Sequence, residues 1–243
     1  MLFSLLLTVG TAMAFTAGYE LTEYFAPAAV AVDGKWTTAT EWSATVVHRM
    51  GTPQKGLFMM MMDATGAYSP SYCIEFADNT NDAGDIIQVC MNGGTDSSTP
   101  RAGDDFKMEI QGGSTVKVYT GTGTGWAETT TTAVQAAVTI TTSPHDPAPH
   151  KVAEFKINKG ALAAWGANPP PEGVRIAMYD ASNPSQGWVA WPPASTADNP
   201  STWGVINNYS MDPAPEGLTV GLMLALSSVA VVVSARYFRK PKL

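Results

Sequence analysis

The central part of the chain alternates short apolar stretches with polar turns, a pattern typical of β-proteins. Within the stretches, apolar and polar residues alternate with a period of two, and clusters of Gly, Pro, Asn and Asp separate them. No apolar period of 3.6 residues is sustained over three turns. We therefore expect an all-β fold with about eleven strands, at residues 44–47, 56–62, 72–76, 86–91, 105–111, 115–120, 125–130, 133–141, 151–157, 173–180 and 188–191.

This number of short strands favours two packed antiparallel sheets, that is, a β-sandwich. We assign residues 15–206 to one such domain, because the segment shows no internal repeat and its length fits a single all-β unit. The segment 157–165 is the one place where we expect a short helical turn, before the prolines at 169–171 end it.

The pattern changes near the C-terminus, where residues 217–235 contain no charged side chain. As a helix this segment would span about 28 Å, the thickness of a bilayer core, so we expect a single transmembrane helix. The tail 236–243 contains four cations, which resist translocation and mark the cytoplasmic side. The prediction is a single-pass protein of the cell membrane with an extracellular body, joined to the helix by a polar stalk at 207–216.

The first fourteen residues resemble an export signal. The apolar stretch LFSLLLTV precedes Ala12-Met13-Ala14, the small-x-small pattern that signal peptidase accepts. We expect residues 1–14 to be a signal peptide cleaved after Ala14. Because the α-amino group is the only positive charge before the apolar stretch, an uncleaved N-terminal anchor and a truncated gene start are the alternatives.

Charge and motifs exclude two classes of function. The chain has 14 Lys and Arg against 21 Asp and Glu, a net charge of −7, and four of the cations lie in the tail, so the body is more acidic still. An acidic body repels phosphate backbones, and we expect no nucleic-acid partner. The sequence has no Gly-x-Ser-x-Gly, His-Glu-x-x-His or phosphate-binding loop, and we expect no enzyme activity.

The two cysteines lie in neighbouring predicted strands, Cys73 in 72–76 and Cys90 in 86–91. Between the strands is DNTNDAGD, made of turn-forming residues, so the pair is predicted to form a hairpin. In that hairpin the cysteines would lie opposite each other, where Cβ separations suit a disulfide. We expect the disulfide in an exported protein; buried free thiols are the alternative for a cytosolic one.

One N-glycosylation sequon is acceptable, Asn208-Tyr209-Ser210 in the predicted stalk. Proline blocks the sequons at Asn183 and Asn199. Asn208 is therefore the candidate glycosylation site.

Three segments, taken in their order along the chain, carry a family resemblance. They are the opening VDGKW with Glu41-Trp42, a middle strand at 57–63, and the late VRIAMYD at 174–180. Together they resemble the DOMON-like superfamily in its family 9 carbohydrate-binding-module branch, over residues 30–206. The segment Pro215-Glu216-Gly217 resembles the anchor regions of archaeal surface proteins. The resemblance implies a β-sandwich at the cell surface that binds glycan or serves as a structural component of the envelope.

Sugar recognition in that branch uses aromatic faces with amides and carboxylates beside them. The resemblance thus implies a ligand site made of Trp188, Trp191, Trp203, Asn183, Asp198 and Asn199. Trp188 and Trp191 are three residues apart, so on an extended strand they would point to opposite faces and at most one would serve the site. The alternative is that the tryptophans close the ends of the core.

The loop between the two cysteine-bearing strands is rich in oxygen donors. Calcium requires ligands of this kind and number, and the candidates are Asp78, Asn79, Asn81, Asp82 and Asp85. The spacing departs from the EF-hand pattern and lacks its closing glutamate. Calcium binding and a plain Asx-rich turn are both open.

The run of methionines at 59–62 raises a second function, because other DOMON-like proteins bind haem b through a methionine. The ligands here would be alternate methionines of the run, Met59 and Met61, with His48, His145, His150 or Lys55 as the second ligand, in an electron-transfer subunit of a membrane-associated redox complex. Core packing is the favoured interpretation of the run, since methionine fills irregular interiors. A third possibility is a purely structural subunit of a surface or membrane assembly, without a small ligand.

Overall fold

The structure is a computed structural model that describes residues 16, 18–26, 29–38, 40–43, 45–63, 69–93, 98–100, 102–162 and 172–210. The described residues confirm the all-β class. The strands are β1 Glu20–Phe25, β2 His48–Met50, β3 Gly56–Asp63, β4 Ser69–Phe76, β5 Ile86–Asn92, β6 Asp105–Gln111, β7 Thr115–Gly121, β8 Trp126–Thr129, β9 Val134–Thr141, β10 His150–Ile157, β11 Glu172–Tyr179, β12 Val189–Trp191 and β13 Gly204–Ser210. Three 3-10 turns accompany them: η1 Lys159–Ala161, η2 Pro184–Gln186 and η3 Pro200–Thr202.

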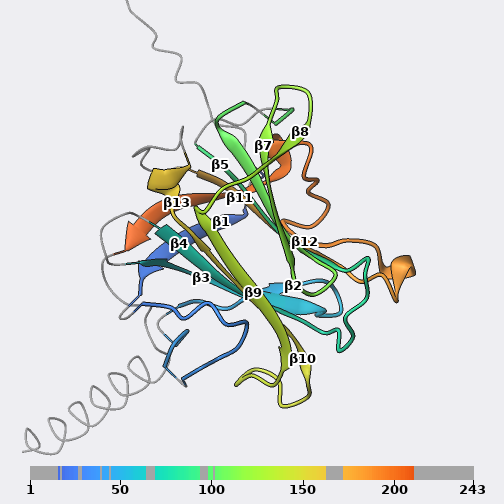
Figure 1. Cartoon of the computed structure of the whole chain (residues 1–243). Coiled ribbons are helices and arrows are strands. Elements are labelled where there is room, and N and C mark those ends of the chain that lie inside the picture. Colours follow the sequence, from blue (N-terminus) through green and yellow to red (C-terminus); the bar gives the residue numbers. More distant parts are fainter. Residues whose placement is uncertain are drawn as a thin grey trace, which may run out of the picture.

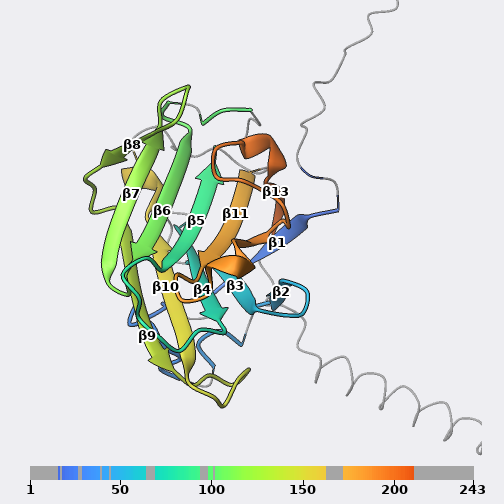
Figure 2. The same ribbon diagram turned by 90° about the vertical axis from the view of Figure 1, so that its right-hand side faces the viewer.

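The strands form one continuous sheet in the order β8-β7-β6-β5-β11-β13-β1-β3-β4-β10-β9, with β12 added to β11 and β2 to β3. The sheet curls so that its two halves face each other as two layers (Figures 1 and 2). Strand β1 joins the halves and runs parallel to both of its neighbours, β13 and β3. The predicted pair of separate, wholly antiparallel sheets is therefore replaced by a single curled sheet with one parallel strand.

Two local predictions also change. The strand expected at 44–47 begins instead at His48, as β2, and β1 and β13 were not predicted. The sequence of β1, ELTEYF, contains two glutamates, which hide its strand pattern. The helical turn expected at 157–165 is present as η1.

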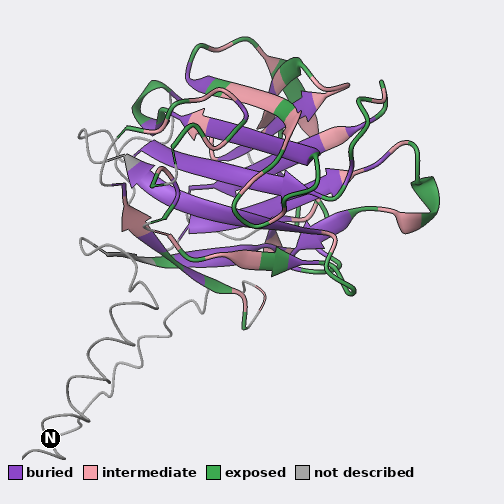
Figure 3. Cartoon of the chain, turned by 90° about the horizontal axis from the view of Figure 1, so that it is seen from below, coloured by how far each residue is buried: buried purple, intermediate pink, exposed green. Residues whose placement is uncertain are grey.

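The main hydrophobic core lies between the two halves of the sheet. In both halves of the sheet, alternate side chains of a strand point into this core. Tyr72 and Ile74 of β4 do so from one half, and Val89 and Met91 of β5 do so from the other. The Tyr72 hydroxyl lies 3.3 Å from Met91 Sδ, which shows that β4 and β5 face each other across the core. Figure 3 shows the central strands largely buried and many of the connecting loops exposed, and β7, β8 and β9 are mostly intermediate or exposed. Full burial of one such apolar side chain stabilises the fold by roughly 1.5–3 kcal/mol.

A second apolar cluster lies on the outer face of β3, β4 and β10, beneath the segment that precedes β2. Glu154 of β10 holds the segment that precedes β2 against this cluster. One of its carboxylate oxygens accepts the Trp42 indole N–H at 2.9 Å, and the other accepts the backbone N–H of Gly34 at 2.9 Å. Burial raises the pKa of Glu154 to about 7. Gly34 has φ +75°, and a Cβ there would lie 2.8 Å from the Val138 backbone, so only glycine fits.

The predicted disulfide is wrong, because the cysteines lie on opposite sides of the molecule. Both Cys73 and Cys90 are free and buried. Strand β4 pairs with β3 and β10, and β5 pairs with β6 and β11, so the loop between them crosses from one half of the sheet to the other. Cys73 belongs to the outer cluster of its half, and Cys90 alternates with core residues of the other half. Facing sheets are about 10 Å apart, whereas a disulfide requires Cα atoms within about 7 Å.

Several predicted segments lie outside the described residues: 1–14, 217–235 and 236–243. In the part of the chain that is described, no helix is long and apolar enough to cross a membrane. Residues 207–210 belong to β13, which pairs with β1, so the strand takes the first four residues of the predicted stalk and includes the backbone of Asn208.

Candidate functional site

A groove with a volume of about 560 Å³ lies where β2 and the turn after it meet the segment around β12. Its lining includes Tyr19, Arg49, Lys55, Gln186, Trp188 and Trp191. Pockets of roughly 300–1,000 Å³ are typical for small ligands. The groove therefore has the size of a small-ligand site and combines aromatic with polar side chains.

Trp188 is the most accessible aromatic side chain of this groove, with 44% of its surface exposed. Its ring centroid lies 5.5 Å from that of Tyr179, and the guanidinium carbon of Arg175 lies 5.5 Å from the Trp188 ring. Arg175 is itself buried and donates from Nε to the Ser195 carbonyl at 3.2 Å. A cation close to an indole face is attracted to it, so these contacts hold the ring while much of it remains open to solvent.

Trp191 lines the same groove but belongs mainly to the core, with 8% of its surface exposed. Its ring packs edge-on against Tyr19 and Phe58, at centroid distances of 5.8 and 5.4 Å. The ring also lies directly on Gly204, where an added Cβ would clash with Cη2 and Cζ3. Trp191 is thus a fixed floor for the groove.

The expectation that Trp188 and Trp191 serve different faces is not what the structure shows, since both line the groove. Trp188 precedes β12, which begins at Val189, and follows Gly187 with φ +65°. Regular strand alternation therefore does not extend to Trp188.

One rim residue adopts an unusual backbone conformation. Ala194 has φ +63°, the only such value for a non-glycine residue within the described ranges. This left-handed conformation costs an L-residue roughly 1–2 kcal/mol. The neighbouring chain is held by Ser195, whose hydroxyl donates to the Pro192 carbonyl at 2.6 Å. Such strained positions tend to occur at binding sites.

The other predicted ligand residues do not line the groove; their side chains hold loops in place. Trp203 is fully buried and donates from Nε1 to the Thr196 carbonyl at 2.8 Å, as the alternative of a core-closing tryptophan anticipates. Asp198 accepts the indole N–H of Trp126 at 2.9 Å. The side-chain oxygens of Asn183 and Asn199 each accept a hydroxyl from a serine two residues later.

Sequence reasoning missed a polar network on the outer face of β5, β6 and β11. Gln88 donates to Glu109 at 2.7 Å and accepts from Arg175, and all three are buried. Lys107 lies 3.4 Å from Glu109 and 4.2 Å from the centre of the Tyr119 ring. In the sequence, this network is visible as polar residues at alternate positions of strands that are otherwise apolar. Through Arg175, this network supports Trp188.

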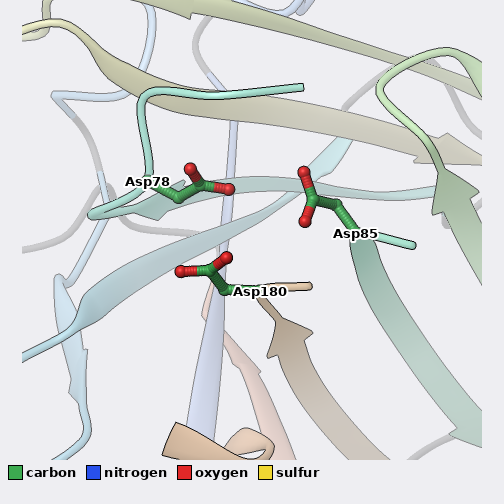
Figure 4. A group of neighbouring side chains, drawn as sticks. All are labelled: Asp78, Asp85 and Asp180. Carbon is green, nitrogen blue, oxygen red and sulfur yellow. The ribbon is translucent and has the colours of Figure 1, made fainter. Parts of the chain in front are cut away.

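The calcium candidates are only partly brought together. Asp78 and Asp85 converge with Asp180, which was not predicted, and one oxygen from each lies within 4.8 Å of the others. Figure 4 shows the three carboxylates turned toward one another, two from the loop between β4 and β5 and one from the loop that follows β11. Asp82 is not in this group, and its carboxylate accepts the Thr80 hydroxyl at 2.6 Å. Asn79 lines a hollow together with Asp78 and Asp180, whereas the Asn81 side chain lies beside Gly113.

Lys151 of β10 already supplies a positive charge to these carboxylates. Its ammonium donates to Asp78 Oδ2 at 2.6 Å and to Asp85 Oδ2, and its side chain is buried. Burial would raise the pKa of Asp78, but hydrogen bonds from Lys151 and Thr80 outweigh it and leave the pKa below its usual value. A calcium ion would have to displace this ammonium, so calcium binding stays a prediction and the protein's own lysine competes with it.

The predicted haem ligands lie on opposite faces of the sheet. His48 stacks on Phe58, with ring centroids 4.9 Å apart, on the core side of β2 and β3. Met59 and Met61 point into the outer cluster, so they pack as the favoured interpretation expected. Burial lowers the pKa of His48. Because the sheet separates His48 from both methionines, the three residues do not form one haem site.

Glu75 is the centre of another cluster that was not predicted. Its carboxylate accepts from Ser143 Oγ at 2.8 Å and from Trp36 Nε1 at 3.1 Å, and it lies 3.0 Å from His145 Nδ1 and 3.2 Å from His150 Nε2. Burial would raise the pKa of Glu75, but hydrogen bonds from His150 and His145 outweigh it and lower it. The hydrogen bond between Glu75 and His150 also raises the pKa of His150. Glu75 thereby fastens the opening segment and the β9–β10 loop to β4.

Comparisons with known proteins find the fold but no sequence family. No family model matches the chain, and no curated protein is detectably similar to it. Among solved structures, a family 9 carbohydrate-binding module from Caldicellulosiruptor kristjanssonii in complex with cellotriose superposes with a TM-score of 0.57 at 14% identity, covering 79% of this chain and 95% of that one. A structure of such a module from the same organism in complex with glucose gives a TM-score of 0.54 at 14% identity, covering 78% and 95%. The chain therefore has the fold of these modules.

Proposed function

We propose that the protein is a non-catalytic carbohydrate-binding module whose ligand lies in the groove beside Trp188. The observation that carries the proposal is a 44% exposed tryptophan on the wall of a groove of about 560 Å³. The C–H faces of a sugar ring stack on an indole, which combines a large apolar surface with an electron-rich face. Gln186 and Arg49, which also line the groove, supply hydrogen-bonding groups for hydroxyls.

Two further observations support a sugar as the ligand. The structures that share this fold hold cellotriose and glucose. The groove is also built before any ligand arrives, because Trp191 is fixed by packing and Trp188 is held by Tyr179 and Arg175. A preformed site loses little conformational entropy on binding.

The location of the module is proposed from the sequence alone. Residues 217–235 form its membrane anchor, residues 236–243 lie in the cytoplasm, and the sandwich is exposed on the outer surface, where glycans of the envelope or of the surroundings are its ligands. Residues 1–14 serve export.

The test is a glycan array followed by calorimetry with full-length protein, kept in a detergent without a sugar headgroup. We expect at least one saccharide to bind, and Trp188→Ala to weaken that binding by about 2 kcal/mol, tens of fold, while the melting temperature stays close to wild type. Val116→Ala, at an exposed apolar position on β7, is the control and should bind normally. Failure of the wild type to bind any saccharide would end the proposal.

A further inference from the structure

The groove has an unusual charge for this protein. Arg49 and Lys55 both line it, whereas none of the described residues in its lining is Asp or Glu. The whole chain has 21 acidic residues against 14 basic ones, and four of the basic ones are in the C-terminal tail. A lining with two cations and no carboxylate is therefore opposite in sign to the body around it.

Neither cation is neutralised within the described part of the chain. The Arg49 guanidinium donates to the neutral amide oxygen of Gln54. Ion pairs of other cations are present, such as Lys107 with Glu109 and Lys151 with Asp78, but none of those found involves Arg49 or Lys55. Both positive charges remain available to a ligand.

The backbone fixes the position of Lys55. Its N–H donates to the Met50 carbonyl at 2.8 Å, and its carbonyl accepts from Ala77 at 2.9 Å. Its side-chain stem lies against Gly51, where an added Cβ would be 3.0 Å from Lys55 Cγ. Lys55 is therefore held beside the tight turn that closes one end of β2.

The aromatic and cationic groups come from different elements. Arg49 and Lys55 belong to β2 and the turn after it, and Trp188 belongs to the segment that leads into β12. β2 and β12 are neighbours in the fold (Figure 1). A ligand in the groove thus meets an indole from one element and two cations from the other.

We infer that the groove selects an acidic saccharide, a uronic-acid oligomer whose ring stacks on Trp188 while its carboxylate binds Arg49 and Lys55. This inference rests on the proposed function. Hydrogen bonds between ionised partners are roughly twice as strong as neutral ones, and a guanidinium matches a carboxylate with two parallel bonds. The acidic body opposes an anionic ligand, but charges more than about 8 Å away are largely screened at physiological salt, whereas the two groove cations act at contact distance.

The experiment compares trigalacturonate with its fully methyl-esterified form, which has the same ring and length but no charge. Calorimetry uses the full chain at 50 mM and 500 mM NaCl. We expect the acid to bind at least ten-fold more tightly than the ester at low salt, with the preference shrinking at high salt. Arg49→Gln and Lys55→Gln should each reduce acid binding several-fold, and by a larger factor than they reduce ester binding.

Lys35→Gln is the matched control, since Lys35 is an exposed cation that does not line the groove. Equal affinity for acid and ester overturns the acidic-sugar inference and leaves the proposed function standing. Acid binding that survives both groove substitutions also overturns it, because the anion is then recognised elsewhere. If neither compound binds and no glycan on the array does, the proposed function itself has failed.

Discussion

The groove beside β12 and the carboxylate cluster at the end of β4 differ in how their polar groups are satisfied. In the cluster, Asp78 and Asp85 share the buried ammonium of Lys151. In the groove, Arg49 and Lys55 have no such carboxylate partner in the described part of the chain, and Trp188 is exposed. The cluster has its counter-ion within the fold, whereas the groove leaves charge and apolar surface for another molecule. The sequence made both regions candidates for ligand binding, and the pairing of the charged residues favours the groove.

The largest effect is expected from Lys151→Met, which removes the internal counter-ion of the cluster. Leaving two buried carboxylates without their cation should lower the free energy of unfolding by about 3–5 kcal/mol. Calcium should then raise the melting temperature of the variant, because the ion can take the place of the ammonium, and it should leave the wild type unchanged. Denaturant and thermal unfolding with calcium or a chelator measure both effects.

Lys35→Met serves as the control for that change, because its ion pair with Asp33 is on the surface and contributes about 0–1 kcal/mol. A wild-type melting temperature that falls in chelator would contradict the comparison, since it would mean that the cluster holds a metal despite Lys151.

Glu23 of β1 is a buried acid of another kind: unlike Asp78 and Asp85, it has no cation bound to it among the described residues and keeps its proton. Its carboxyl oxygens are buried without a hydrogen-bond partner in the described structure, and burial raises its pKa to about 8, from a usual value of 4.5. Between these two pH values the folded state binds more protons than the unfolded state, so stability should fall as pH rises, by roughly 3–4 kcal/mol from this group.

Glu23→Gln should remove this part of the pH dependence and stabilise the protein at pH 8. Unfolding by urea at pH 5, 6, 7 and 8 measures the slope for both proteins. Parallel slopes for wild type and variant would show that Glu23 is ionised and paired in solution.

Gly204→Ala tests the floor of the groove. The added methyl group would clash with the Trp191 ring, so we expect the ring to shift, a loss of about 1–3 kcal/mol in stability, and weaker saccharide binding. Gly125→Ala is the matched control, because a Cβ there meets no atom within 4 Å, and it should change stability and saccharide binding little. Tryptophan fluorescence and thermal unfolding report the two effects, and unchanged binding by Gly204→Ala would exclude Trp191 from the site.

Much of the fold could be predicted from the sequence. The boundaries of β6 and β10 agree with prediction to within a residue, because their alternating patterns are strong and turn residues flank them. β1 could not be found, because its two glutamates interrupt the pattern and its parallel pairing with distant strands leaves no local signal. The hairpin prediction for Cys73 and Cys90 failed for a related reason: a polar turn between two strands does not reveal whether the chain returns in the same layer or crosses to the other.

The candidate site was predicted in part. Trp188 and Trp191 were named from the sequence, and both line the groove, whereas Arg49, Lys55 and Gln186 were missed. Arg49 and Lys55 are too far from Trp188 along the chain for any local pattern to connect them, whereas Gln186 is only two residues from Trp188 and was overlooked.

The sequence by itself determined the all-β class, the acidic body and most strand positions, because these depend on residue type and local alternation. The resemblance to a known family added two aromatic residues of the groove. Only the tertiary structure decided which charges meet a partner. Lys151 reaches Asp78 and Asp85 because β10 pairs with β4, and Arg49 reaches the groove because β2 lies beside β12. Charge compensation depends on distances between residues far apart in the sequence, and the curled sheet sets those distances.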